Sequence, residues 1–90
     1  MRRIRFVVTG RVQGVAFRAH TENAAQRLGL VGFVRNRRDG AVEGEAEGSE
    51  MAVTEFAAWL HTGSPWSRVD AVQVDELSGL GGEVAFEVRP

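Results

Sequence analysis

The spacing of apolar residues along the chain changes near residue 17. Between residues 4 and 8 every second position is apolar, and this period of two predicts a half-buried strand that ends near Thr9. From Phe17 onward the apolar positions follow the period of a helix, and Gly29 suits the C-terminal cap of that helix. Residues 10–16 are therefore predicted to form a loop between strand and helix. The helical stripe consists of Phe17, Thr21, Ala24, Ala25 and Leu28.

A hairpin is predicted after this helix. Residues 30–36 form its first strand, and Asp39 followed by Gly40 favours a tight turn. Residues 41–47 form the partner strand, in which small or apolar residues alternate with glutamates. Successive side chains of a strand point to opposite faces, so one face of the partner strand is apolar and the other is acidic.

The acidic face consists of Glu43, Glu45 and Glu47. We expect this row to be a solvated face, with Arg3 and Arg5 of the first strand lying opposite it. Exposed ion pairs of this kind contribute at most ~1 kcal/mol each. A carboxylate metal site is the less favoured interpretation of the same row.

A second helix follows the hairpin. Ser49 is a suitable N-cap, and Gly63 with Pro65 closes the helix. Trp59 and Trp66 are expected to be packing residues at the end of this helix. Its apolar stripe consists of Val53, Phe56, Ala57 and Leu60.

The last third of the chain supplies one or two further strands. One strand is predicted around residues 69–75, followed by a glycine-rich loop over residues 78–82 and a final strand. The order β-α-β-β-α-β matches an α+β fold, the ferredoxin-like α/β sandwich, with two helices on one face of an antiparallel or mixed sheet. The third strand of that topology lies between the first and the second. Residues 1–90 are expected to form a single domain. The final strand carries Val84, Phe86 and Val88.

Composition excludes several kinds of chemistry. The chain has no cysteine, which excludes disulfides, thiolate metal ligands and thiol nucleophiles. All of its basic residues are arginines, which excludes lysine Schiff bases and the lysine of a P-loop. His20 and His61 lie on different predicted helices without a ligand-spaced partner, so no metal site is expected.

The net charge and the hydropathy of the chain argue against nucleic acid and membrane as partners. A net charge of -1 argues against a nucleic-acid surface, which is usually strongly basic. No apolar run approaches the ~18 residues of a membrane-spanning helix, and the first residues lack the apolar stretch of a signal peptide. We therefore expect a cytoplasmic monomer that binds neither nucleic acid nor membrane.

Two separate stretches are predicted to meet at one edge of the sheet. A β-α-β crossover is nearly always right-handed with parallel strands, so the loop at residues 10–16 and the strand end at Asn36 share that edge. Glycines and a helix N-terminus can form an anion cradle, to which Arg18 would add a guanidinium fork for phosphoryl oxygens. By itself, a glycine-containing loop before a helix is more often a plain connecting turn than a phosphate site.

These stretches carry a resemblance to a known family. Residues 10–18 (GRVQGVAFR), residues 32–36 (GFVRN) and residues 39–43 (DGAVE) are similar to the signature of the acylphosphatases. The similarity extends from the first strand to the closing Phe86-Glu87-Val88-Arg89. Ala16, where glycine is common, and His20, where an aromatic residue is frequent, depart from the pattern.

The resemblance implies hydrolysis of a carboxyl-phosphate anhydride to a carboxylate and inorganic phosphate, without a metal or other cofactor. It implies that Arg18 binds the phosphoryl group and that Asn36 positions the attacking water. The partner would be a small acyl phosphate and its product phosphate. The substrate-binding residues it implies are Gln13, Gly14, Val15, Ala16, Phe17 and Arg18.

Two other functions fit the same order of elements. RNA-recognition domains share it and stack bases on aromatic strand residues, but residues 41–47 carry glutamates there, which repel phosphates. The other alternative is an acylphosphatase-like regulatory or accessory domain of a larger protein.

Overall fold

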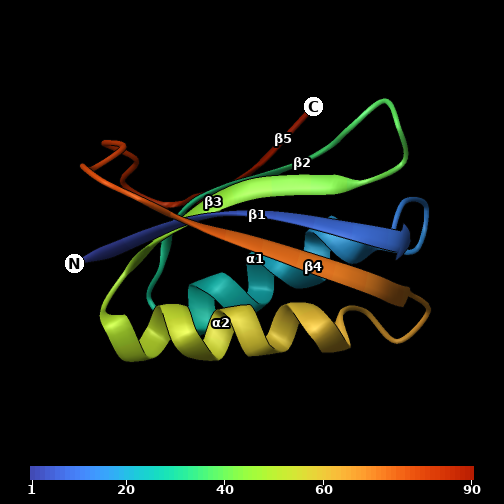
Figure 1. Ribbon diagram of the computed structural model, residues 1–90, viewed down its shortest axis with the longest axis horizontal. Helices are drawn as coiled ribbons and strands as arrows, with labels where there is room; N and C mark the ends of the chain where they lie inside the picture. Colours follow the sequence, from blue (N-terminus) through green and yellow to red (C-terminus); the bar gives the residue numbers. More distant parts are fainter.

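The computed structural model describes residues 1–90, arranged as one sheet with both helices on the same face (Figure 1). This arrangement confirms the predicted α+β fold of ferredoxin-like type, with the last predicted strand divided into two. The elements are β1 (Arg2–Arg11), α1 (Phe17–Arg27), β2 (Val31–Asn36), β3 (Val42–Gly48), α2 (Glu50–Thr62), β4 (Arg68–Leu77) and β5 (Phe86–Arg89).

The five-stranded sheet has the order β4-β1-β3-β2-β5. β3 lies between β1 and β2, as predicted, and pairs antiparallel with both. β1 and β2 are therefore parallel to each other, and their C-terminal ends lie at the same edge. β5 pairs parallel with the outer side of β2, which brings the C-terminal residues to this edge as well.

The core lies between the sheet and the two helices. Phe6 of β1 contacts Phe56 of α2 edge to face, with ring centroids 5.4 Å apart. Gly44 of β3 is required at its position, because a Cβ atom there would meet the Phe6 ring and the carbonyl oxygen of Phe33. The core cluster comprises 14 buried residues, which include the predicted Ile4, Phe17, Ala25, Val53 and Leu60.

The N-terminal strand is longer than its apolar pattern indicates. β1 continues past Thr9 to Arg11, because β4 pairs with it up to Arg68 across a register shift between Thr9 and Gly10. Gly10 has φ 125°, and a Cβ atom there would collide with the carbonyl of Arg68. Only glycine combines this backbone conformation with so close an approach of two strands.

Two expectations about apolar side chains are wrong. Trp66 is 65% exposed and reaches only the edge of the His20 ring, whereas Trp59 packs against Phe17 as expected. Val84 is 94% exposed, because it precedes β5, which begins at Phe86. Apolar character alone does not bury a residue that lies outside the paired part of an edge strand.

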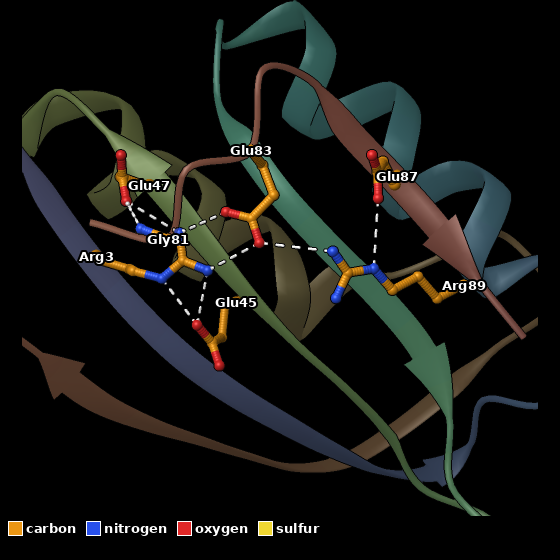
Figure 2. A network of polar contacts seen from close by, with 7 residues as sticks. All are labelled: Arg3, Glu45, Glu47, Gly81, Glu83, Glu87 and Arg89. Carbon is orange, nitrogen blue, oxygen red and sulfur yellow. Dashed lines mark hydrogen bonds and ion pairs between the residues drawn. The ribbon is translucent and has the colours of Figure 1, made fainter. Parts of the chain in front are cut away.

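The acidic face of β3 is only partly solvated, which corrects the expectation for Arg3. Arg3 and Arg5 lie opposite the glutamates as predicted, but Arg3 is only 5% exposed. The loop between β4 and β5 crosses this face, and its Glu83 and Gly81 join the cluster around the guanidinium (Figure 2). Arg3 donates hydrogen bonds to Glu45 (2.7 Å), Glu47 (2.9 Å) and Glu83 (3.0 Å).

Burial alone would lower the pKa of Arg3, but its hydrogen bonds to Glu83, Glu45 and Glu47 outweigh burial and raise it. The same contact with Arg3 holds the pKa of Glu83 below its usual range. The Arg3 guanidinium and the Glu83 carboxylate are therefore both charged, and their contact holds the β4–β5 loop against the sheet.

Candidate active site

The loop after β1, the first turns of α1 and the end of β2 enclose a pocket of about 280 Å³. Arg18 and Asn36, which are 18 residues apart in sequence, both line it, so the structure brings the two predicted site residues together. β5 closes one side. The lining residues are Val12, Gly14, Ala16, Phe17, Arg18, Ala19, Glu22, Asn36 and Val88.

The backbone of this loop offers a run of free donors. None of the N–H groups from Val12 to Ala19 donates a hydrogen bond to another group of the chain. α1 begins at Phe17 without a side-chain cap, and Ala16 before it has the left-handed φ of 60°. Unpaired N–H groups and the positive end of the helix dipole lie together here, and both favour an anion.

Side chains hold the loop in this shape from outside the pocket. Gln13 Nε2 donates to the carbonyls of Arg37 (2.7 Å) and Ala41 (2.9 Å), which ties the loop to the β2–β3 turn. Ser64 Oγ donates to the carbonyl of Val15 at 2.8 Å, which ties it to the segment after α2. Neither Gln13 nor Val15 is among the residues that line the pocket.

Asn36 lines the pocket and also holds a buried acceptor that has no partner. It is the last residue of β2, and its Oδ1 is buried without a hydrogen-bond partner. Buried polar atoms in folded proteins are nearly always paired, and the exceptions often have a functional reason.

The comparisons with known proteins agree on one family. The acylphosphatase family model matches residues 4–88. The chain belongs to the acylphosphatase family. It is 50% identical to an acylphosphatase of Rubrobacter xylanophilus, over 98% of this chain and 80% of that protein, and 49% identical to one of Anaeromyxobacter dehalogenans, over 97% and 94%. The crystal structure of the acylphosphatase from Bacillus subtilis superimposes with a TM-score of 0.97 at 41% identity, covering 100% of both chains.

Acylphosphatases are hydrolases that act on acyl phosphates, so the predicted family, fold and enzyme class are confirmed. The substrate class is a small acyl phosphate. Neither helix combines the length and the apolar composition that crossing a membrane requires.

The acylphosphatase pocket also contains residues that the sequence did not single out. Glu22 lies one helical turn after Arg18, and this spacing of four could have indicated it. Val88 reaches the pocket, and the carbonyl of Arg89 reaches Arg18, only because β5 adds to the sheet beside β2. No local sequence pattern predicts that contact.

Arg89 links the pocket to the cluster of Arg3. Arg18 Nη1 donates a hydrogen bond of 2.9 Å to the carbonyl of Arg89. The guanidinium of Arg89 lies 3.6 Å from Glu83, which also accepts from Arg3 (Figure 2). It also lies 4.1 Å from the centre of the Phe33 ring. A continuous series of contacts thus runs from the open face of the sheet to Arg18.

A second pocket of about 400 Å³ shares Asn36 with the first and is rich in arginine. Arg35 and Arg37 share Glu43 at 2.7 and 3.8 Å, while Arg38 forms none of the ion pairs in the chain. The pocket also contains Asp39 and Glu43, so Arg38 is the arginine there that has no ion-pair partner.

Proposed function

We propose that the chain hydrolyses acyl phosphates with Arg18 and the backbone of the loop binding the phosphoryl group and Asn36 positioning the attacking water. The observation that carries this proposal is the meeting of three features at one pocket: free backbone N–H groups, Arg18 and Asn36. The proposed binding segment runs from Gln13 to Arg18.

The loop and Arg18 supply the charge that phosphoryl transfer needs. The transition state is loose, with negative charge spread over the equatorial oxygens, so catalysis depends on positioning and electrostatic stabilisation. Backbone N–H groups at the start of α1 are fixed donors for these oxygens. Arg18 adds a planar, permanently charged fork and is itself oriented by the carbonyl of Arg89.

Asn36 completes the site by holding the nucleophile. A water molecule hydrogen-bonded to the side-chain amide of Asn36 turns a lone pair toward phosphorus. The water oxygen forms a bond to phosphorus while the bond to the acyl oxygen breaks, and the carboxylate leaves with that electron pair. The remaining water proton passes to a phosphoryl oxygen of the substrate. A carboxylate leaves without protonation, so no general acid is required.

Phosphate release from benzoyl phosphate by the purified protein tests this proposal. Inorganic phosphate is expected to inhibit competitively, because the loop recognises the anion and not the acyl group. Absence of phosphate release would overturn the proposed activity. Non-competitive inhibition would overturn the placement of the phosphoryl group in the loop.

The organisation of the protein is part of the same proposal. The enzyme is proposed to act as a monomer, with one domain over residues 1–90. A cytoplasmic location and the absence of a nucleic-acid partner also remain proposals. Sedimentation of the active protein as a dimer would contradict the proposed monomer.

A further inference from the structure

Glu22 is an anomaly in a pocket built for an anion. It lines the same cavity as Arg18 and the loop whose backbone N–H groups are free. Arg18 and Glu22 have the spacing of a helical ion pair, but Arg18 donates to the carbonyl of Arg89 instead. Glu22 takes part in none of the ion pairs of the chain. A negative group at this place weakens phosphate binding, so its presence calls for another role.

The geometry of the proposed reaction indicates which part of the substrate lies near Glu22. The attacking and leaving oxygens lie roughly in line through phosphorus. With the water on Asn36, the acyl group extends away from Asn36, and therefore away from the arginine-rich second pocket that shares this residue. The part of the first pocket that remains for the acyl group is lined by Ala19, Glu22 and Val88.

The distance along α1 suits an acyl substituent. Glu22 follows Arg18 by four residues, which corresponds to roughly 6 Å along a helix. A phosphoryl group held at Arg18 thus places the carbon atoms of a short acyl chain beside the methyl groups of Ala19 and Val88. A polar group at the far end of that chain would lie next to the carboxylate of Glu22.

We propose that Glu22 is a specificity-determining residue that favours acyl phosphates with a cationic or N–H donor group on the acyl part over those with a second anion there. This inference rests on the proposed placement of the phosphoryl group and the water. Glu22 attracts a positive substituent and repels a negative one, while the contacts to the phosphoryl group are the same for every substrate.

Three benzoyl phosphates test the proposal: the unsubstituted compound, the para-trimethylammonium compound and the para-carboxylate compound. The measured quantity is the ratio of kcat/KM for the cationic compound to kcat/KM for the anionic one. Glu22→Gln is expected to lower this ratio by roughly tenfold, as two opposite interactions at ~6 Å in a water-rich site are removed together. The three compounds differ in the intrinsic reactivity of their leaving groups. This difference is the same for wild type and variant, so it cancels when their two ratios are compared.

Glu55→Gln is the matched control, because Glu55 is an exposed helical glutamate that lies beside the last turn of α1 in a separate pocket. This variant is expected to keep the wild-type ratio. The proposal is wrong if Glu22→Gln leaves the ratio unchanged, if it changes all three rates by a common factor, or if Glu55→Gln shifts the ratio equally. Failure of the wild type to hydrolyse the unsubstituted compound would instead contradict the proposed function.

Discussion

Nη1 of Arg18 donates a hydrogen bond of 2.9 Å to the main-chain carbonyl of Arg89, 71 residues later in the chain. The residue proposed to bind phosphate is thus oriented by the last strand of the sheet. Arg89 is in turn held by Glu83, which Arg3 anchors on the open face. The position of β5 therefore affects the active site as well as the stability of the sheet.

Glu83→Gln is expected to impair phosphate binding although Glu83 lies outside the pocket. Loss of its charge releases Arg89 and loosens the carbonyl that orients Arg18, and small displacements of a binding group are costly in rate. We expect affinity for inorganic phosphate and kcat/KM to fall together by roughly tenfold, measured by titration and steady-state kinetics on a variant with wild-type circular dichroism.

Glu87→Gln is the matched control for this variant. Glu87 also contacts Arg89, at 3.3 Å, but its side chain is 52% exposed and does not reach Arg3. We expect its kcat/KM to stay within about twofold of wild type, as for most exposed pairs. Equal effects of the two substitutions would contradict a role for the buried cluster in orienting Arg18.

The contribution of Glu83 to stability is expected to depend on pH. Its hydrogen bond with Arg3 lowers its pKa in the folded state. A carboxyl group of lowered pKa stabilises the fold fully above its unfolded pKa of about 4.3 and loses this contribution as pH falls through the folded pKa. Urea unfolding should show a large difference between wild type and Glu83→Gln at neutral pH and a smaller one in strong acid. A difference that grows on acidification would contradict the assigned charge state.

The two proposed site residues are expected to differ in their kinetic effects. Arg18→Ala should weaken phosphate binding and turnover together, because its charge meets the phosphoryl group before and during the reaction. Asn36→Ala should leave phosphate binding nearly unchanged and lower kcat by ~10² to 10³, as for the loss of one donor or acceptor at a reacting centre. An Asn36→Ala protein that folds normally and retains wild-type turnover would falsify the water-positioning role.

Excess chelator is expected to leave the activity unchanged. The groups proposed to act are backbone N–H groups, a guanidinium and an amide, none of which needs a metal to bind phosphate. Phosphate release is measured before and after dialysis against chelator. Loss of activity that a divalent metal restores would overturn the proposed reaction.

The sequence was sufficient to predict the topology and the proximity of Arg18 and Asn36. The changes of period at Phe17 and after Gly29 locate the first β-α-β unit, and the handedness rule then brings Arg18 and Asn36 to one edge. The roles of both residues came from the resemblance, because an asparagine before a turn is by itself an ordinary turn residue.

Other features depend on contacts that no local pattern encodes. Arg3 is buried because a loop some 80 residues later folds back over it, and alternation along β1 cannot reveal such a cover. The contact of Arg89 with Arg18 requires the parallel pairing of β5 with β2. The last strand is short and exposed at its edge, so its apolar pattern predicted neither its start nor its neighbours.

Ala16 offers a final test, because it is the only non-glycine residue with a positive φ, 60°. A left-handed conformation costs roughly 1–2 kcal/mol for a residue with a Cβ atom, and glycine avoids this cost while losing more entropy on folding. We therefore expect Ala16→Gly to raise the free energy of unfolding by up to about 1 kcal/mol. Ala19→Gly, three residues later in the first turn of α1, should instead lower it by about 0.5 to 1 kcal/mol. Urea unfolding of both variants gives the comparison. If both substitutions destabilise the protein equally, Ala16 does not hold the left-handed conformation in solution, and the loop that presents its N–H groups to phosphate has another shape.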